Sequence, residues 1–344
     1  LYDFLNRNDS RYTAIVFMPY LYGPTLRGLP LVKDRAFIQP CLHDETYAYL
    51  PAAEAIFHAA RGVLFNSDGE AELAANLYGP GILAKGVCVG EGVEVASNVP
   101  HAEDASLLDA KVARLLDRRE PYILSVGRRD TTKNTDLLLN AFARYRAENP
   151  ASRLGLVVAG PGDLPPAPGD RTGVVDVGYV AERDKEALLA VCAAVVQPSQ
   201  NESYSRAMME AWMKARPVVA HRRCRATARA IEECGGGWLA DDEVEWGHVF
   251  AAIESADPHR LADLGRKGQA YAEEHADWDK VITRYERVLR LRESTARARS
   301  RVQSRVTEVH QVLADLSPGD AISNHAIFLR DTLTALGFES RIFV

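Results

Sequence analysis

Tyr122-Ile-Leu-Ser-Val-Gly127 begins the part of the sequence that decides the fold. This apolar run predicts a buried strand, and the apolar residues of segment 136–149 recur at helical spacing. The same alternation continues, with strands expected at 154–160, 173–180, 195–197 and 217–220 and helices at 185–194 and 203–215. It predicts an α/β fold, in which helices cover both faces of a parallel sheet. Ligands of such sheets bind where the strands end.

The N-terminal part of the chain, residues 1–105, shows this alternation with fewer elements. Strands are expected at 13–17, 36–39, 63–65 and 86–89, and helices at 51–60 and 69–77. An open parallel sheet usually has more strands, so we expect an incomplete N-terminal domain. The polar segment 106–118 is interpreted as a connection to a second domain at 119–275.

The composition of the 344 residues is that of a folded protein, with 47% hydrophobic and 26% charged residues. It excludes a disordered or fibrous chain. A net charge of −6 argues against a nucleic-acid partner. Five cysteines without a CxxC pair are typical of reduced thiols in the cytoplasm, and they predict neither a disulfide framework nor a metal site.

Two carboxylates stand eight positions apart in the segment Pro198-Ser-Gln-Asn-Glu202-Ser-Tyr-Ser-Arg-Ala-Met-Met-Glu210. On one helix they would lie roughly 12 Å apart along the axis, too far for a paired acid and base on one bond. The spacing suits an elongated ligand with hydroxyls at both ends and an anion between them. Amides of Ser203, Tyr204 and Ser205 at the helix start can hold that anion. The alternative is that Glu202 only favours the helix N-terminus and that Glu210 is a surface residue.

The same segment resembles glycosyltransferase family 4, the retaining nucleotide-sugar transferases with the GT-B fold of two Rossmann-like domains. The family signature is Pro-Ser-x-x-Glu, seven residues, Glu-Ala, and then Pro-Val after a short turn. The residues that carry the resemblance are Pro198-Ser199, Glu202, Glu210-Ala211, Pro217-Val218, and upstream Val126-Gly127-Arg128, Lys133-Asn134, Val157 to Gly162 and Gly178-Tyr179-Val180.

The resemblance implies a role for each matched residue. Glu202 would contact the donor sugar as a catalytic residue, and Glu210 would bind the ribose hydroxyls. Arg128 and Lys133 would neutralise the diphosphate, whose negative charge grows as the sugar leaves. The implied nucleotide-binding set also contains Gly127, Val180, Ser203, Tyr204 and Ser205. The resemblance implies metal-independent chemistry without a cofactor, although Arg128 and Lys133 can also be read as ordinary surface cations.

Three positions bear on the substrates. Tyr204-Ser205 stands where the family often has Phe-Gly, and the segment His221 to Ala226 replaces a Gly-Gly turn near the donor, so the donor is not identified. His43, in Pro40-Cys-Leu-His43-Asp44-Glu45, resembles a family histidine at a strand end. It would contact the donor sugar or the acceptor, or it would be a structural loop residue.

Two classes of function follow. The first is transfer of a sugar, with retention, from a nucleotide-diphosphate sugar to a glycan or lipid-linked acceptor. The second is a donor-binding or partner module of a larger tandem transferase, without turnover. A Rossmann oxidoreductase is disfavoured because no GxGxxG follows a strand.

The C-terminal part divides into a closing helix at 276–292, a basic linker at 293–305 and a tail at 306–344. The arginines from residue 284 to 305 are interpreted as a solvated helix end and linker, or alternatively as a peripheral contact with the inner face of an anionic membrane. The tail repeats a strand, a Gly-containing loop, a helix and a strand. We expect it to begin a second transferase module, so that the chain is a slice of a tandem protein. The alternative is that the tail completes the first domain, as in a circular permutation.

Overall fold

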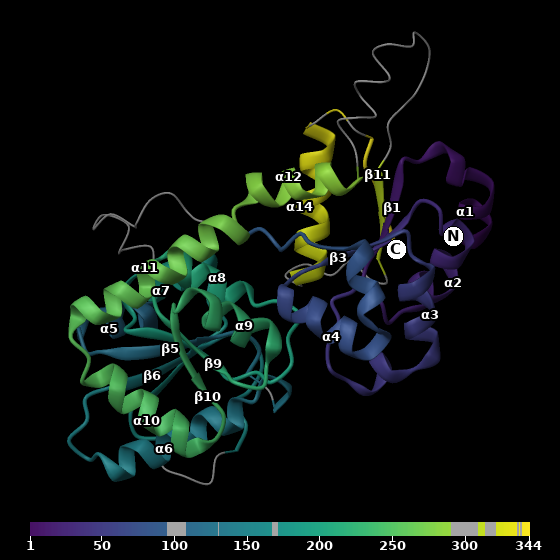
Figure 1. Cartoon of the computed structure of the whole chain (residues 1–344). Helices are drawn as coiled ribbons and strands as arrows, with labels where there is room; N and C mark the ends of the chain where they lie inside the picture. Colours follow the sequence, from purple (N-terminus) through teal and green to yellow (C-terminus); the bar gives the residue numbers. More distant parts are fainter. Residues whose placement is uncertain are drawn as a thin grey trace. The chain divides into compact units, whose positions relative to one another are not determined.

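The computed structural model describes residues 1–94, 108–129, 131–166, 171–289, 309–313, 321–335, 337 and 339–344. The chain divides into two compact units (Figure 1). Unit 1 comprises residues 1–92 and 275–344, and unit 2 comprises residues 93–274. Each unit contains a parallel sheet with helices packed against it, which confirms the predicted α/β class with two Rossmann-like domains.

Unit 2 contains a six-stranded parallel sheet in the order β10-β9-β8-β5-β6-β7. Its strands are β5 (Tyr122–Val126), β6 (Gly155–Ala159), β7 (Val174–Gly178), β8 (Ala194–Gln197), β9 (Val218–His221) and β10 (Gly237–Ala240). Its helices are α5 (Ala110–Asp117), α6 (Thr135–Glu148), α7 (Glu182–Val191), α8 (Arg206–Met213), α9 (Arg225–Cys234), α10 (Glu243–Glu254) and α11 (Pro258–His275, extending one residue into unit 1). The predicted connection at 106–118 therefore contains a helix of unit 2, α5, whose N-cap Asp109 donates its N–H to Asp184 at 2.9 Å.

Helices of unit 2 pack against the sheet and against one another. On one face, α6 and α10 bring Phe142, Trp246 and Phe250 into a core with the strand residues. Elsewhere α11 lies very close to α8, because a Cβ added at Gly268 would stand 2.1 Å from the ring of Trp212. Only glycine permits this approach of the two helices.

Unit 1 contains a second six-stranded parallel sheet, in the order β12-β11-β1-β2-β3-β4. Its strands are β1 (Ala14–Phe17), β2 (Ala36–Ile38), β3 (Gly62–Phe65), β4 (Gly86–Cys88), β11 (Val309–Val312) and β12 (Ile342–Phe343). Its α-helices are α1 (Tyr2–Asn8), α2 (Gly23–Gly28), α3 (Pro51–Ala59), α4 (Asp68–Tyr78), α12 (Trp278–Leu289) and α14 (Ala321–Ala335), and short 3-10 turns lie at 9–11, 29–32, 46–49 and 80–85.

Two cores hold unit 1 together. Ile15 and Phe17 face a core that includes Phe57 of α3. Val16, the intervening residue of β1, faces the opposite core with Tyr285 of α12 and Leu329 of α14. Alternation along the strand therefore distributes consecutive apolar residues to both faces, as expected for a buried parallel strand.

The C-terminal segment corrects the expectation for the tail. β11 pairs with β1 in parallel, with Ala14 opposite Val309 and Phe17 opposite Val312, and β12 pairs with β11. Within this chain β11 and β12 thus extend the first sheet to six strands. The expectation that residues 306–344 begin a separate module is wrong for this structure, and the alternative of completion agrees with it. The physical reason is that β1 would otherwise expose an unpaired edge and an uncovered apolar face.

Some predicted features lie outside the described residues. They are the basic linker at 293–305 and residues 317–320 of the Gly-containing loop, whose residues 321–324 belong to α14. Among the described residues, no helix is both long and apolar enough to cross a membrane.

Candidate functional site

The strand order of unit 2 reverses direction at its centre. From β5 the chain proceeds through β6 to β7 on one side, and β8, β9 and β10 then follow on the other side. In open α/β sheets this reversal opens a crevice at the carboxyl ends of the two central strands, where ligands bind. The loops that follow β5 and β8 therefore frame the candidate site.

Contacts between polar groups join these two loops. The Nζ of Lys133 lies 2.5 Å from Oε1 of Glu202, and Nδ2 of Asn134 donates to the carbonyl of Pro198 at 3.0 Å. Gln197, the last residue of β8, donates to the same Glu202 oxygen at 3.3 Å. The Glu202 side chain is only 9% exposed. A buried carboxylate next to an ammonium group and an amide is held in one orientation at the mouth of the crevice.

Asn134 reaches Pro198 from an unusual backbone conformation. Its φ of 58° and ψ of 33° place it in the left-handed region, which asparagine adopts more readily than most residues. It is the N-cap residue of α6, so this conformation sets where the helix begins. The loop between β5 and α6 is therefore fixed at its far end beside Glu202.

The two arginines after Gly127 differ in their surroundings. Arg128 is exposed, whereas Arg129 is buried and donates to Asp176 and to the carbonyl of Gly162. The Arg129 contacts tie the loop after β5 to β7 and to the loop after β6. The sequence analysis did not select Arg129, and the only sequence feature that pointed to it was its position next to Arg128. Arg128 is thus the arginine of the pair with access to a ligand.

Glycines bring the strand ends together. A Cβ at Gly160 would lie 1.8 Å from the carbonyl oxygen of Gly127, so the ends of β5 and β6 can approach only without a side chain there. At Gly127 itself, a Cβ would meet nothing within 4 Å. The backbone of Gly127 therefore borders open space, which suits close approach by a phosphate.

The helix that follows Glu202 begins later than predicted. α8 starts at Arg206, and Ser205 is its N-cap, with Oγ accepting from the Met208 N–H at 3.3 Å. The amides of Ser203, Tyr204 and Ser205 consequently precede the helix and are not its free first-turn amides. The helical rise estimated between Glu202 and Glu210 does not apply either. The N-cap preference of serine is the signal that would have placed this boundary.

Glu210 has a cationic partner that sequence reasoning missed. Nζ of Lys185, on α7, lies 2.9 Å from Oε2 of Glu210 and 2.8 Å from Glu182. Arg206 lies 3.9 Å from the other Glu210 oxygen. Burial lowers the pKa of Lys185, but the charges of Glu210 and Glu182 outweigh it and leave the pKa raised. Glu210, a carboxylate only 10% exposed, is therefore oriented between two cations.

The segment after β9 lies beside Glu202. Cys224, the N-cap residue of α9, is buried, and burial and the nearby Glu202 charge raise the pKa of its thiol. The arginines of this segment are engaged with carboxylates, since Arg223 lies 2.8 Å from Asp241 and Arg222 lies 2.9 Å from Glu245.

His221 closes the end of β9. Its Nδ1 accepts from the Arg223 N–H at 3.2 Å, and its Nε2 lies 3.6 Å from Asp241. Burial lowers the pKa of His221 despite the Asp241 charge, so the imidazole is neutral at pH 7. A turn with buried ends, His221 and Cys224, and an exposed middle thus replaces the Gly-Gly turn expected from the resemblance.

Val180 and His43 are the remaining predicted positions. Val180 follows β7 and is half-buried, next to Tyr179, which is 80% exposed. His43 belongs to unit 1, where it is half-buried in the loop after β2. That loop is anchored by Glu45, which accepts from the Tyr20 hydroxyl at 2.9 Å, and by Leu42, which donates to Glu70 at 2.5 Å. Within unit 2, the structure brings together Lys133 with Glu202 and Lys185 with Glu210.

The described residues contain no cluster of three or more histidine, cysteine, aspartate or glutamate side chains arranged to hold a metal ion. Cations at the carboxyl edge of the sheet include Arg128 and Lys133 in the loop after β5 and Lys185 on α7. Such groups can bind a diphosphate by charge-assisted hydrogen bonds.

Comparison with known proteins agrees with this geometry. Residues 120–255 match the family described as "Glycosyl transferases group 1". A D-inositol 3-phosphate glycosyltransferase of Catenulispora acidiphila is 32% identical over 247 residues, which cover 66% of this chain and 56% of the relative. The chain therefore spans little more than half the length of that relative.

Solved structures share the fold. The α,α-trehalose 6-phosphate synthase of Burkholderia multivorans superposes with a TM-score of 0.62 at 12% identity, over 87% of this chain and 75% of that one. Anabaena Alr3699/HepE, solved with UDP, superposes with a TM-score of 0.58 at 16% identity, over 86% and 81%. The chain thus has the GT-B fold of glycosyltransferases, and its unit 2 contains the segment that matches the group 1 family.

Proposed function

We propose that the chain is a glycosyltransferase that binds a nucleotide-diphosphate sugar at the carboxyl edge of the unit 2 sheet. The contact between Lys133 and Glu202 carries the proposal. It joins the loops on the two sides of the strand reversal, and both residues lie in the segment that matches the transferase family. Anabaena Alr3699/HepE has this fold and was solved with UDP, which supports the same class of donor here.

The proposed roles follow from the surroundings of each group. Arg128 and Lys133 neutralise the diphosphate, and the Gly127 backbone lets it approach. Glu210, oriented by Lys185, accepts hydrogen bonds from the ribose hydroxyls, and Val180 lies against the base. Glu202 acts at the sugar, where its interaction strengthens as positive charge develops during bond cleavage. His43 of unit 1 contacts the sugar or the acceptor.

We further propose that transfer proceeds with retention, without a metal or cofactor, to a glycan or lipid-linked acceptor in the cytoplasm. These finer points rest on the family 4 resemblance of Glu202 and Glu210. The comparisons do not favour the alternative of a donor-binding module without turnover.

Calorimetric titration of UDP and GDP in the presence of EDTA tests the donor site. We expect one nucleotide to bind with 1:1 stoichiometry, and Lys133→Ala to weaken it by roughly tenfold or more, as expected for the loss of a charged hydrogen bond. Arg153→Ala, an exposed arginine before β6, is the matched control and should bind as the parent does. Binding that disappears on chelation would contradict the metal-free proposal, and equal binding by both variants would contradict the site.

A further inference from the structure

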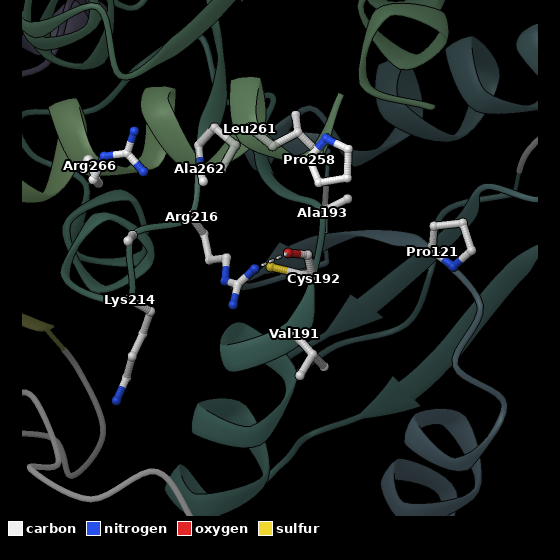
Figure 2. A pocket seen from close by; sticks show the side chains of 12 residues that line it. Pro121, Val191, Cys192, Ala193, Lys214, Arg216, Pro258, Leu261, Ala262 and Arg266 are labelled. Atoms are coloured by element: carbon white, nitrogen blue, oxygen red, sulfur yellow. Dashed lines mark hydrogen bonds between the residues drawn. The ribbon is translucent and has the colours of Figure 1, made fainter. Parts of the chain in front are cut away.

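A cavity of about 400 Å³ lies at the edge of the unit 2 sheet opposite to the candidate site (Figure 2). Among its lining residues, Pro121, Ala193 and Pro217 each directly precede a strand, namely β5, β8 and β9. The cavity therefore lies at the amino ends of the central strands, whereas the loops with Lys133 and Glu202 follow their carboxyl ends. Its volume is within the range of small-molecule sites.

The wall of this cavity is chemically divided. Figure 2 shows Lys214 and Arg266 toward the left, Arg216 next to Cys192 near the middle, and Val191 and Pro121 toward the right. Every remaining lining residue is apolar or cysteine, and the lining contains no carboxylate. Val191 is 58% exposed although it is a large apolar residue. The cavity thus offers an apolar surface next to cationic groups.

The positive charge of the cavity is only partly compensated. Lys214 lies 2.5 Å from Glu186, and Arg266 lies 3.3 Å from Asp263. Arg216 has no carboxylate within ion-pair distance in the part of the chain that the structure describes. Its NH groups donate to the carbonyls of Ala190 and Cys192 at the end of α7, and its buried Nε makes no hydrogen bond to a described group.

Two weakly acidic groups that interact electrostatically with Arg216, Cys192 and Tyr122, do not supply a negative charge. Burial raises the pKa of the Cys192 thiol to about 12. Burial likewise raises the pKa of the Tyr122 phenol well above its usual value. Both groups are neutral at pH 7, so Arg216 faces the cavity with its charge balanced only by carbonyl dipoles.

We propose that this cavity binds an amphipathic anion, a phosphate or carboxylate joined to an apolar chain or ring. The anion lies against Arg216, Lys214 and Arg266, because guanidinium and ammonium groups bind phosphate and carboxylate by charge-assisted hydrogen bonds. The apolar part lies against Val191, Leu261 and Pro258. This site is separate from the proposed donor site, and it does not depend on the transferase activity.

Octyl phosphate, below its micellar concentration, is the probe for the shared chemistry. Calorimetry should show 1:1 binding that persists in the presence of saturating UDP or GDP and in the Lys133→Ala variant. Inorganic phosphate lacks the apolar chain and octanol lacks the anionic group, so each should bind at least about tenfold more weakly than octyl phosphate. Sedimentation with vesicles of phosphatidic acid in phosphatidylcholine decides the source of the anion, because cosedimentation that octyl phosphate prevents indicates a lipid. Octyl phosphate binding without cosedimentation indicates a free metabolite.

Two exposed positions give variants that should fold. Arg266→Ala should weaken octyl phosphate binding by about two- to fivefold, as for an exposed ionic contact. Lys267→Ala is the matched control, because Lys267 also pairs with Asp263, at 3.1 Å, but does not line the cavity. Val191→Asp, which adds a negative charge on the apolar wall, should weaken binding by about tenfold or more. The absence of binding to the parent protein, or equal binding by all three variants, would overturn the proposal.

Discussion

The two sheets of this protein have the same number of strands and the same internal reversal, but they are assembled differently. The strands of unit 2 come from one continuous stretch of chain between Tyr122 and Ala240. Unit 1 combines strands from residues 14–88 with β11 and β12 from residues 309–343. Similar sheets are therefore built from strands of one continuous segment in unit 2 and from strands distant in the sequence in unit 1.

The difference has a consequence for cooperativity. In unit 2, α6, α8 and α9 each connect two neighbouring strands, so these loop closures are short and cost little entropy. In unit 1, β1 is central only because β11 returns to pair with it, and α12 and α14 complete the core around Val16. Unit 1 should therefore depend on its C-terminal segment, and unit 2 should not.

Removal of residues 306–344 tests this dependence most severely. The truncated chain loses β11, α14 and β12, which leaves β1 as an edge strand and uncovers Val16 and Tyr285. We expect unit 1 to lose its cooperative unfolding transition in calorimetry, while unit 2 keeps its own transition and its nucleotide binding. Amide exchange at Ala14–Phe17 as slow as in the full chain would contradict the dependence.

Substitutions of Glu202, Glu210 and His43 should have different effects on turnover and on nucleotide affinity. Glu202→Gln should lower turnover by roughly 10²–10³-fold with little change in nucleotide affinity, since its interaction strengthens in the transition state. Glu210→Gln should instead weaken UDP or GDP binding by about tenfold or more, through loss of a charged hydrogen bond. His43→Ala, in unit 1, should lower turnover and leave nucleotide affinity unchanged. Equal effects of Glu202→Gln and Glu210→Gln on affinity would refute the assignment.

A glycine pair probes the packing of unit 2. Gly268→Ala places a Cβ 2.1 Å from the Trp212 ring, so α11 must move away from α8. We expect a loss of about 1–3 kcal/mol in the free energy of unfolding, measured by urea denaturation. Gly247→Ala in α10 is the control, because its Cβ meets nothing within 4 Å and alanine is the better helix former. It should stabilise the protein by up to about 1 kcal/mol, and a loss in both variants would indicate that the close approach is not the cause.

The smallest expected effect concerns the turn between α8 and β9. Ala215 has a φ of 53°, a left-handed conformation that costs roughly 1 kcal/mol for a residue with a Cβ. Ala215→Gly should therefore stabilise unit 2 by up to about 1 kcal/mol in the same denaturation assay. Ala270→Gly, at an exposed position within α11, should destabilise it by about 1 kcal/mol. Destabilisation by both substitutions would show that Ala215 is not strained.

The sequence determined those features of unit 2 that depend on neighbouring residues. Apolar periodicity located the strands from Tyr122 to Ala220 within a few residues, because each strand must bury a short apolar run. It missed the start of α8 at Arg206, where the N-cap hydrogen bond of Ser205 outweighs the continuing helical pattern. The site residues Glu202, Glu210, Arg128 and Lys133 were found through a motif, and their assigned roles stay predictions.

Only the tertiary structure decided which distant groups meet. No local pattern indicates that Lys185 reaches Glu210, that Arg129 is the buried arginine of its pair, or that Val309 pairs with Ala14. Apolar periodicity shows which face of a segment is buried, but it does not show which other segment covers that face. The sequence by itself therefore predicted a strand, a helix and a strand in the tail, and the uncovered edge of β1 decided where they belong.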